Sequence, residues 1–336
     1  MFRRSGPALY GLGLFPADFP EALQSSLHPQ SAVAQLIAKI GWVMFVGGTL
    51  IFLAVLMLAL YAVFAPRERR AAIGRRSLIV GGGVIFPAVS LFALLLYALV
   101  TADRIVDIDE PADVRIEVIG EQFWWRVRYL DAAGGIGAVI ANEIHIPVDR
   151  PVDFIVKSAD VIHSFWVPSL AGKIDMIPGR TNTLRIKADN TGTWRGQCAE
   201  YCGAQHGKMA FHVVVESPEA FAAWLAAQRR PAEAPDDSFL QRGKALFLAD
   251  DCGREDCCAD CHTVRGTAAE GDHGPDLTHV GSRRWIAAGT LPNNPGTLAG
   301  WIAASQHLKP GNHMPSFAAY EGEELRALAA YLESLK

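Results

Sequence analysis

The sequence predicts a multi-domain membrane protein that consists of a two-helix transmembrane hairpin, an all-β sandwich and a small all-α domain. Two long runs without charged residues come first, short alternating segments rich in β-branched residues follow, and helical periodicity dominates the C-terminal part. The 336 residues are 50% hydrophobic and 20% charged, which is too apolar for an ordinary soluble chain and too charged for a wholly embedded one. The net charge of −4 argues against a nucleic-acid partner, because phosphate binding needs a basic surface.

The transmembrane hairpin is predicted from the two uncharged runs. Ile40–Phe64 and Ser77–Thr101 each contain 25 residues without a charge, and a helix needs about 20 to cross a bilayer core. Pro87 lies in the second run, where a neighbouring helix can compensate for the missing backbone hydrogen bond. A pair of buried soluble helices is the alternative, and two such runs so close together argue against it.

The loop between the two runs sets the predicted orientation. Residues 65–76 contain five arginines and one glutamate, a net charge of +4, so the positive-inside rule places this loop in the cytoplasm. Both ends of the chain are then expected outside, in the periplasm of a bacterial inner membrane. Residues 102–336 contain 23 basic and 32 acidic residues, a net charge of −9 on the outer side.

Short strands are predicted after the hairpin, and helices are predicted near the C-terminus. The strand segments alternate in hydrophobicity and are separated by Gly, Pro, Asp and Asn, which is typical of a sandwich or barrel. The predicted strands are Val114–Val118, Trp124–Tyr129, Asn142–Ile146, Val152–Val156, Thr183–Ile186 and Phe211–Val215, and the predicted helices are Phe239–Leu248, Thr297–Gln306 and Glu321–Leu335. The expected boundaries are an external segment at 1–39, the hairpin at 40–101, the β-domain at 102–227, a linker at 228–238 and the α-domain at 239–336.

A copper site is predicted in the β-domain. Cys198, Cys202, His206 and Met209 lie within twelve residues, in G-Q-C-A-E-Y-C-G-A-Q-H-G-K-M, between two expected strands. Thiolates, an imidazole and a thioether are soft ligands that favour copper over ions that prefer oxygen. The second cysteine indicates two coppers bridged by both thiolates, which requires another histidine. His163, in D-V-I-H-S-F-W-V-P, is the candidate.

Each of these residues also has a structural interpretation. A histidine near aromatic residues is commonly a hydrogen-bonded core residue, and His163 is selected here only because a ligand is missing. Two cysteines in an oxidising compartment commonly form a disulfide. A disulfide between Cys198 and Cys202 does not account for a histidine and a methionine at the following positions.

These segments, together with K-I-D-M-I-P-G-R, resemble subunit II of the haem–copper cytochrome c oxidases. The resemblance covers roughly residues 30–225 and implies a cupredoxin-like fold that holds a dinuclear copper centre, Cu-A. It implies that Cys198 and Cys202 bridge the coppers, that His163 and Met209 complete one, and that His206 and the main-chain carbonyl of Glu200 complete the other. It also implies that the Glu200 carboxylate binds a magnesium ion at the interface with the catalytic subunit.

An aromatic stretch departs from the pattern of that family. Members that accept electrons from a separate cytochrome c usually have tryptophan where this chain has Phe123, in E-Q-F-W-W. Phe123, Trp124 and Trp125 are therefore candidates for electron transfer. Core packing is the alternative for the two tryptophans, and it is the preferred interpretation for at least one of them.

A covalent haem is predicted in the α-domain. Cys258, Cys261 and His262 form C-A-D-C-H, the C-x-x-C-H pattern in which two thiols add to the haem vinyl groups and the histidine reaches the iron. Met314, in K-P-G-N-H-M-P-S-F, is the expected second axial ligand, and its neighbour His313 is the competing candidate. A His/Met pair leaves no open coordination position, which suits electron transfer rather than oxygen binding.

The α-domain resembles the cytochrome c domain that is fused to subunit II in some bacterial caa3-type oxidases, including G-P-D-L-T-H-V-G-S-R. The resemblance implies that the carbonyl of Pro275 orients the ring of His262. Cys252 and Cys257 lie in an acidic stretch that looks inserted relative to that domain, and a local disulfide between them is expected in an oxidising compartment.

The expected function is electron transport as the redox subunit of a cytochrome c oxidase, with no catalytic residue for oxygen reduction in this chain. Neither membrane run contains a histidine, so the oxygen-reducing haem and copper must belong to a partner. Expected partners are the catalytic subunit I, other oxidase subunits, the lipid bilayer, and a donor cytochrome c or upstream respiratory complex. Two alternatives remain open, namely a Cu-A and haem c subunit of a nitric oxide reductase and a membrane-anchored copper carrier or assembly protein.

Overall fold

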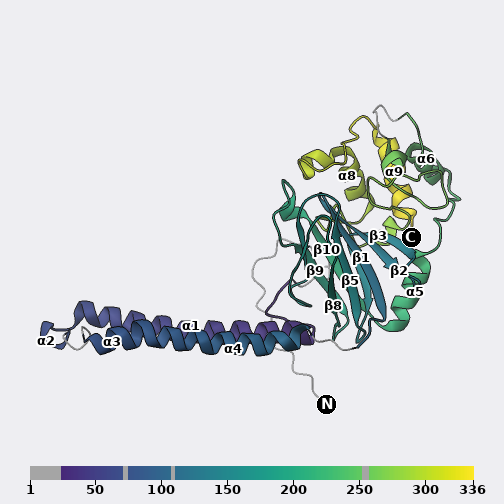
Figure 1. Cartoon of the computed structure of the whole chain (residues 1–336). Helices are drawn as coiled ribbons and strands as arrows, with labels where there is room; N and C mark the ends of the chain where they lie inside the picture. The colour runs from purple at the N-terminus through teal and green to yellow at the C-terminus, as the bar shows by residue number, and fades with distance from the viewer. Residues whose placement is uncertain (1–23, 71–74, 107–109, 252–256) are drawn as a thin grey trace, which may run out of the picture.

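The computed structural model describes residues 24–70, 75–106, 110–251 and 257–336, and it divides into a helical arm and a two-part head (Figure 1). The helices of the arm are α1 (Ala32–Phe64), α2 (Arg67–Arg70), α3 (Arg76–Val80) and α4 (Phe86–Val106), with a π-helical turn, η1 (Gly81–Ile85), between the last two. The β-sandwich joins the arm, and the helical domain lies on the side of the sandwich away from it (Figure 1).

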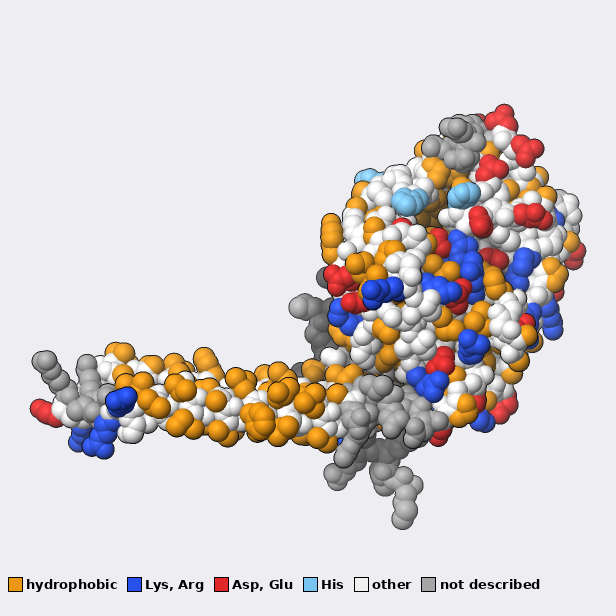
Figure 2. Space-filling view, viewed as in Figure 1, with side chains coloured by type: hydrophobic (Ala, Val, Ile, Leu, Met, Phe, Trp, Pro, Cys, Tyr) orange, Lys and Arg blue, Asp and Glu red, His pale blue; other side chains and the backbone are white. Residues whose placement is uncertain are grey.

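The arm has the features of a membrane hairpin. Ala32–Phe64 and Arg76–Ala102 are long and apolar enough to cross a membrane, and their apolar windows are not buried by the rest of the chain. Hydrophobic side chains cover the arm, while basic side chains gather at its far end (Figure 2). The π-helical turn immediately precedes Pro87, which cannot donate a backbone hydrogen bond within the helix.

The first helix begins at Ala32 and not at Ile40, so it extends into the predicted external segment. Ser31 caps it by accepting a hydrogen bond from the backbone of Ala34, and the Ser31 hydroxyl donates to the carbonyl of Leu170 in the sandwich. The prediction was based on the uncharged run alone. Such a run identifies only the lipid-facing part of a helix, so it did not include the capped residues that precede it.

Two five-stranded sheets form the sandwich. One sheet has the order β3-β2-β1-β5-β8 and the other β4-β10-β9-β6-β7, and each contains one parallel pair. The strands are β1 (Val114–Glu121), β2 (Trp124–Leu130), β3 (Ile136–Ala141), β4 (Glu143–Pro147), β5 (Val152–Ser158), β6 (His163–Trp166), β7 (Ile174–Met176), β8 (Asn182–Ile186), β9 (Gly192–Cys198) and β10 (Ala210–Glu216). Trp125, Phe154, Phe165 and Phe211 are fully buried between the sheets and form the centre of the core.

A helical domain follows α5 (Pro218–Gln228) and has a second core of its own. Its elements are α6 (Ser238–Phe247), α7 (Cys258–Cys261), a 3-10 turn η3 (Val280–Ser282), a small hairpin of β11 (Trp285–Ile286) and β12 (Leu291–Pro292), α8 (Pro295–Leu308) and α9 (Gly322–Ser334). The helices expected at 239–248, 297–306 and 321–335 correspond to α6, α8 and α9.

The two domains of the head are in direct contact along a seam. The indole of Trp285 stacks on the ring of His212 in β10, with ring centroids 3.7 Å apart. The backbone N–H of Ala210 donates to the carbonyl of Ala288, and that of Arg284 donates to the Glu143 carboxylate. The β11–β12 hairpin is therefore docked on the sheet that carries the copper-ligand candidates.

Candidate copper and haem sites

The predicted copper ligands converge at one end of the sandwich. Cys198 ends β9, His163 begins β6, and the segment that follows Cys198 carries the remaining candidates through the 3-10 turn η2 (His206–Lys208) to β10. Because β6 pairs with β9, with Phe165 opposite Cys198, the sheet itself brings the histidine and the first cysteine together. Backbone pairing inside the sheet thus positions donors that are far apart in the sequence.

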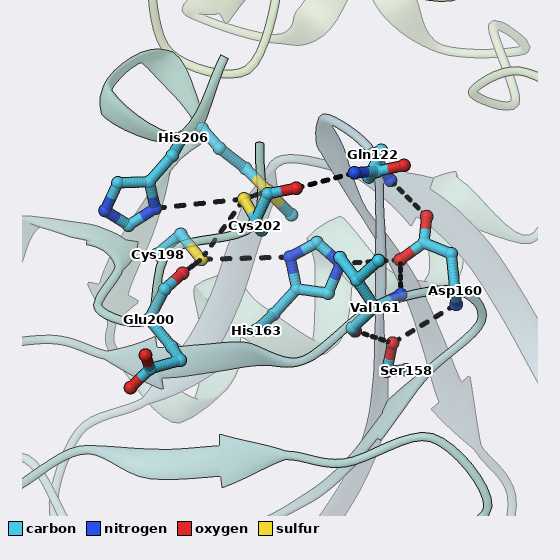
Figure 3. Close-up of polar contacts among 10 residues, drawn as sticks. Gln122, Ser158, Asp160, Val161, His163, Cys198, Glu200, Cys202 and His206 are labelled. Carbon is cyan, nitrogen blue, oxygen red and sulfur yellow. Dashed lines mark hydrogen bonds and ion pairs between the residues drawn. The ribbon is translucent and has the colours of Figure 1, made fainter. Parts of the chain in front are cut away.

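The donor atoms lie around the two sulfurs (Figure 3). Cys198 Sγ lies 3.8 Å from Cys202 Sγ and 3.8 Å from His163 Nδ1, and these three donors all lie within 4.8 Å of one another. Cys202 Sγ lies 3.8 Å from His206 Nδ1 and 3.8 Å from Met209 Sδ, while the Glu200 carbonyl oxygen lies 3.1 Å from Cys198 Sγ. One imidazole therefore lies beside each sulfur.

The thiols are mutually perturbed in a way that favours a bound cation. The contact with Cys202 lowers the pKa of Cys198 to about 3, and the same contact raises the pKa of Cys202. A metal ion needs deprotonated thiols as ligands and displaces the proton that such a pair retains. The soft donor set and this proximity fit copper.

Asp160 was not identified from the sequence and belongs to this site. Its carboxylate lies 2.7 Å from Nε2 of His163, on the far side of the ring from Cys198 (Figure 3). Burial lowers the pKa of His163, but the Asp160 hydrogen bond and the Cys198 sulfur outweigh it and raise that pKa to about 9. A carboxylate on the outer nitrogen fixes the ring and directs the other nitrogen to a metal. The signal was present as the aspartate of D-V-I-H.

The Glu200 side chain points away from the sulfurs, as Figure 3 shows. Its carboxylate lies 3.7 Å from the ammonium of Lys173 and is half-exposed. The main-chain carbonyl and the side chain of Glu200 thus face different surroundings. The structure brings the carbonyl, and not the carboxylate, to the copper-ligand candidates.

The haem candidates line one cleft at the seam between the domains. Cys258, Cys261, His262 and Met314 all line it, and its empty space is about 1280 Å³ including the open mouth. Most of its other walls are apolar, which suits a macrocycle. They include Leu277, Val280, Leu298, Trp301, Ile302, Phe317 and Leu332 of the helical domain and Gln122, Phe123, Trp124 and Asn142 of the β-domain.

The ring of His262 is oriented by the carbonyl of Pro275, as the resemblance implies. Its Nδ1–H donates to the Pro275 carbonyl at 2.7 Å, which leaves Nε2 as the nitrogen for a metal. Burial lowers the pKa of His262, so the ring is neutral at pH 7. Gly274 packs on the same ring so closely that a Cβ there would lie 2.5 Å from it. The residues present therefore fit a haem c iron.

The axial candidates Met314 and His313 both line the cleft but differ in packing. Met314 is half-buried and packs on the core of the helical domain, and its backbone is held by hydrogen bonds to Asn312 and Ser305. His313 is exposed and lies 6.3 Å from the ring of Phe123.

The aromatic electron-transfer candidates separate into two environments. Trp125 is fully buried and packs on Phe165 and Phe211 in the sandwich core. Phe123 and Trp124 line the cleft, and the Phe123 ring also packs on Gly203, beside Cys202.

The predicted disulfide falls partly outside the described residues. Cys252 lies outside them. Cys257 lies among the described residues and is not one of their free cysteines. The pairing of Cys252 with Cys257 stays a prediction.

Comparison with known proteins gives a consistent result for both domains. Residues 136–217 match the family described as cytochrome c oxidase subunit II, periplasmic domain, and residues 240–336 match the cytochrome c family. A protein named alternative cytochrome c oxidase subunit 2, from Bradyrhizobium diazoefficiens, is 31% identical over 53% of this chain and 75% of its own length. The chain belongs to the cytochrome c oxidase subunit 2 family.

Two further members of the family align over more of this chain. The cytochrome c oxidase subunit 2 of Alkalihalophilus pseudofirmus is 39% identical over 66% of this chain, and the match spans 61% of that relative's length. That of Bacillus sp. (strain PS3) is 29% identical over 75% of this chain and 72% of its own length. The two matched families imply that this chain binds copper and haem c, and the apolar helix pair together with family membership implies that it is anchored in a membrane.

Proposed function

We propose that this chain takes up electrons for a haem–copper terminal oxidase, from cytochrome c through a haem c to a dinuclear copper centre and on to a catalytic subunit that reduces oxygen. When bound, the haem and the copper ions supply one-electron redox chemistry. The observation that carries the proposal is the shared wall between the two sites. Phe123 lines the haem cleft and packs on Gly203, directly after Cys202.

The chain contributes the wall, the ligands and their orientation. The backbone carbonyl of Cys202 accepts a hydrogen bond from the Gln122 side chain at 2.5 Å, and Gln122 and Phe123 both line the cleft. The hydrogen bond between Gln122 and Cys202 therefore connects the wall of the haem cleft to a copper-ligand candidate by a short route. Phe123 is the aromatic residue placed to contribute to this route, whereas Trp125 supports the core.

Two coppers, rather than one, account for the donor arrangement. Cys198 and Cys202 present their sulfurs side by side, and His163 and His206 lie beside different sulfurs. Cys198 and Cys202 would hold two ions together, and His163 and His206 would each serve one of them. Met209 and the Glu200 carbonyl then supply the weaker ligands. How the ligands divide between the ions, as implied by the resemblance, is part of the proposal.

The assignment of His262 and Met314 as axial ligands and of Cys258 and Cys261 as the attachment sites is supported by the cleft that they share. Met314 is preferred to His313 because its side chain packs on the domain core and its loop is anchored. The Glu200 carboxylate, which points away from the sulfurs, is proposed to bind magnesium together with residues of the catalytic subunit.

The proposed location follows from charge. The loop at the far end of the arm carries a net charge of +4 in the sequence, so that end is proposed to lie in the cytoplasm. The copper and haem domains then lie on the periplasmic side, where an external donor reaches them. The oxygen-reducing site is assigned to a partner because neither apolar span contains a histidine.

Purification of the complex from membranes tests the proposal. We expect a co-purifying large haem subunit, a covalent haem on this chain after denaturing electrophoresis, and an electron paramagnetic resonance signal with the multiline splitting of one electron shared by two coppers. We also expect oxygen consumption with reduced cytochrome c. Reduction of nitric oxide but not oxygen would contradict the oxidase assignment, and a single exchangeable copper without covalent haem would indicate a copper carrier.

A further inference from the structure

Lys309 carries a buried charge at the seam between the two domains. It follows α8 directly, and only 2% of its surface is exposed. Its ammonium donates to the backbone carbonyl of Lys208 at 2.9 Å and to that of Ala287 at 3.1 Å. Both acceptors are neutral, and no carboxylate of the described residues lies within 4.0 Å of the Lys309 ammonium. A buried lysine with neutral partners needs an explanation.

Burial makes this charge costly but does not remove it. Burial lowers the pKa of Lys309 to about 8, with a further lowering contribution from the neighbouring Lys208. The side chain therefore remains mostly protonated at pH 7. Removal of the ammonium would leave the carbonyls of Lys208 and Ala287 without this donor, so its charge and its hydrogen bonds have to be tested separately.

The position of Lys309 relates it to both redox sites. Its acceptor Lys208 lies between His206 and Met209, two of the copper-ligand candidates. The Lys309 side chain also lines the haem cleft. Lys309 therefore lines the haem cleft, and its ammonium is bonded to the segment that carries His206 and Met209.

Neighbouring contacts fix this position. The ammonium of Lys208 donates back to the carbonyl of Leu308 at 2.8 Å, and the Gln205 amide donates to the carbonyl of Pro310 at 2.5 Å. Residues 205–208, in the segment that carries the copper-ligand candidates, are thereby bonded to residues 308–310. These residues lie shortly before Met314 in the sequence. The charge of Lys309 is held in place between two anchored segments.

We propose that Lys309 is a positioning residue whose fixed positive charge raises the reduction potentials of both the copper centre and the haem. This inference rests on the proposed function, since it requires both centres. A positive charge in a region of low dielectric stabilises whichever centre has gained an electron. Because it is shared between the sites, the same charge favours electron uptake at the haem without opposing transfer to copper.

Redox titration of the purified complex tests this role. Lys309→Met keeps the length of the side chain and removes the charge, and Lys309→Gln also keeps a hydrogen-bond donor. We expect both variants to lower the reduced-to-oxidised ratio of both centres about tenfold at a fixed ambient potential, which is about 59 mV for a one-electron couple. The haem is followed by its visible absorption and the copper centre by its near-infrared absorption.

Lys208→Met is the matched control. It removes an exposed ammonium and a hydrogen bond from the same seam, and we expect less than a twofold change because solvent screens that charge. Lys309→Arg keeps the charge, and we expect its reduced-to-oxidised ratios at both centres to equal those of the parent.

Two results would overturn the role of the charge. The first is a Lys309→Gln variant that contains both centres and has the same reduced-to-oxidised ratios as the parent. The second is a change in these ratios that is equal in Lys309→Met and Lys208→Met. Loss of both centres from Lys309→Met and Lys309→Gln, with retention in Lys309→Arg, would show that the charge serves assembly and not the potentials. The spectra of the parent complex test the proposed function separately, because they require only that both centres are present.

Discussion

The copper-ligand candidates and the haem-ligand candidates are held in different ways. The copper donors come from two paired strands and one loop of a single β-core, and their contacts with one another are already 3.1–3.8 Å without any group bound. The haem donors surround an open cleft whose walls come from two domains. A compact ion site can be completed by the backbone pairing of one domain, whereas a large planar cofactor must itself fill much of its site.

The largest expected effect tests whether the haem completes its own domain. In the double variant Cys258→Ala and Cys261→Ala, we expect complete loss of covalent haem and a strongly destabilised helical domain, because the apolar cleft is left unfilled. Copper content should remain near that of the parent. The measurements are haem staining after denaturing electrophoresis and elemental analysis. The reciprocal control, Cys198→Ser, should lose the copper signal and keep the haem, and loss of both centres in either variant would contradict the independence of the two sites.

The next effect tests the rigidity of the copper scaffold. Trp125→Ala removes a fully buried side chain between the sheets, and such changes cost about 3–5 kcal/mol in free energy of unfolding. Trp124→Ala is the control, because Trp124 is half-exposed and lies under the guanidinium of Arg126, whose Cζ is 4.9 Å from the ring centroid. Urea unfolding of the full chain should show a much larger loss for Trp125→Ala. Equal losses would mean that Trp125 is not central to the scaffold.

A smaller effect concerns the orientation of one copper ligand. Asp160→Asn weakens the hydrogen bond to His163, and we expect copper affinity to fall by about 10–100-fold, as is common for partners of ligating histidines. Asp175→Asn is the matched control, since that carboxylate is half-exposed and contacts Lys173. Competition with a copper chelator measures the affinity. An unchanged affinity in Asp160→Asn would show that the strand alone orients the ring.

The smallest expected effect is a pH dependence of stability that arises from His145 in β4 of the sandwich. Burial lowers the pKa of His145, but hydrogen bonds to Glu143 and Glu216 outweigh it, so the pKa is raised. Its contribution to stability is therefore complete below the unfolded pKa of about 6.5 and is lost as pH rises through the folded pKa. The difference in Tm between the parent and His145→Gln should shrink as the pH rises through that range. A difference that grows with pH would contradict this assignment.

The sequence predicted much of this arrangement where the signal is local. Alternation located six strands, and the ligand spacings predicted two groups of candidate residues, because C-x-x-x-C and C-x-x-C-H are short and chemically restrictive. The sequence did not locate β3, β6, β7 or β9. His163–Trp166 and Ile174–Met176 are too short to show a period. The contact of Asp160 with His163, the cleft wall supplied by Phe123 and the burial of Lys309 depend on tertiary packing, which spacing along the chain does not encode.

The capped start of α1 has a mechanical consequence. The hydroxyl of Ser31 bonds to Leu170 in the sandwich, the backbone of Gln30 bonds to Ser169, and the membrane helix begins at the next residue, Ala32. At this junction the membrane helix therefore follows directly on residues that are hydrogen-bonded to the sandwich, without a flexible linker between them. Under the proposed function, the height of the copper centre above the bilayer is set by the geometry of this helix end, so residues inserted after Ser31 would change the distance between that centre and a partner in the membrane.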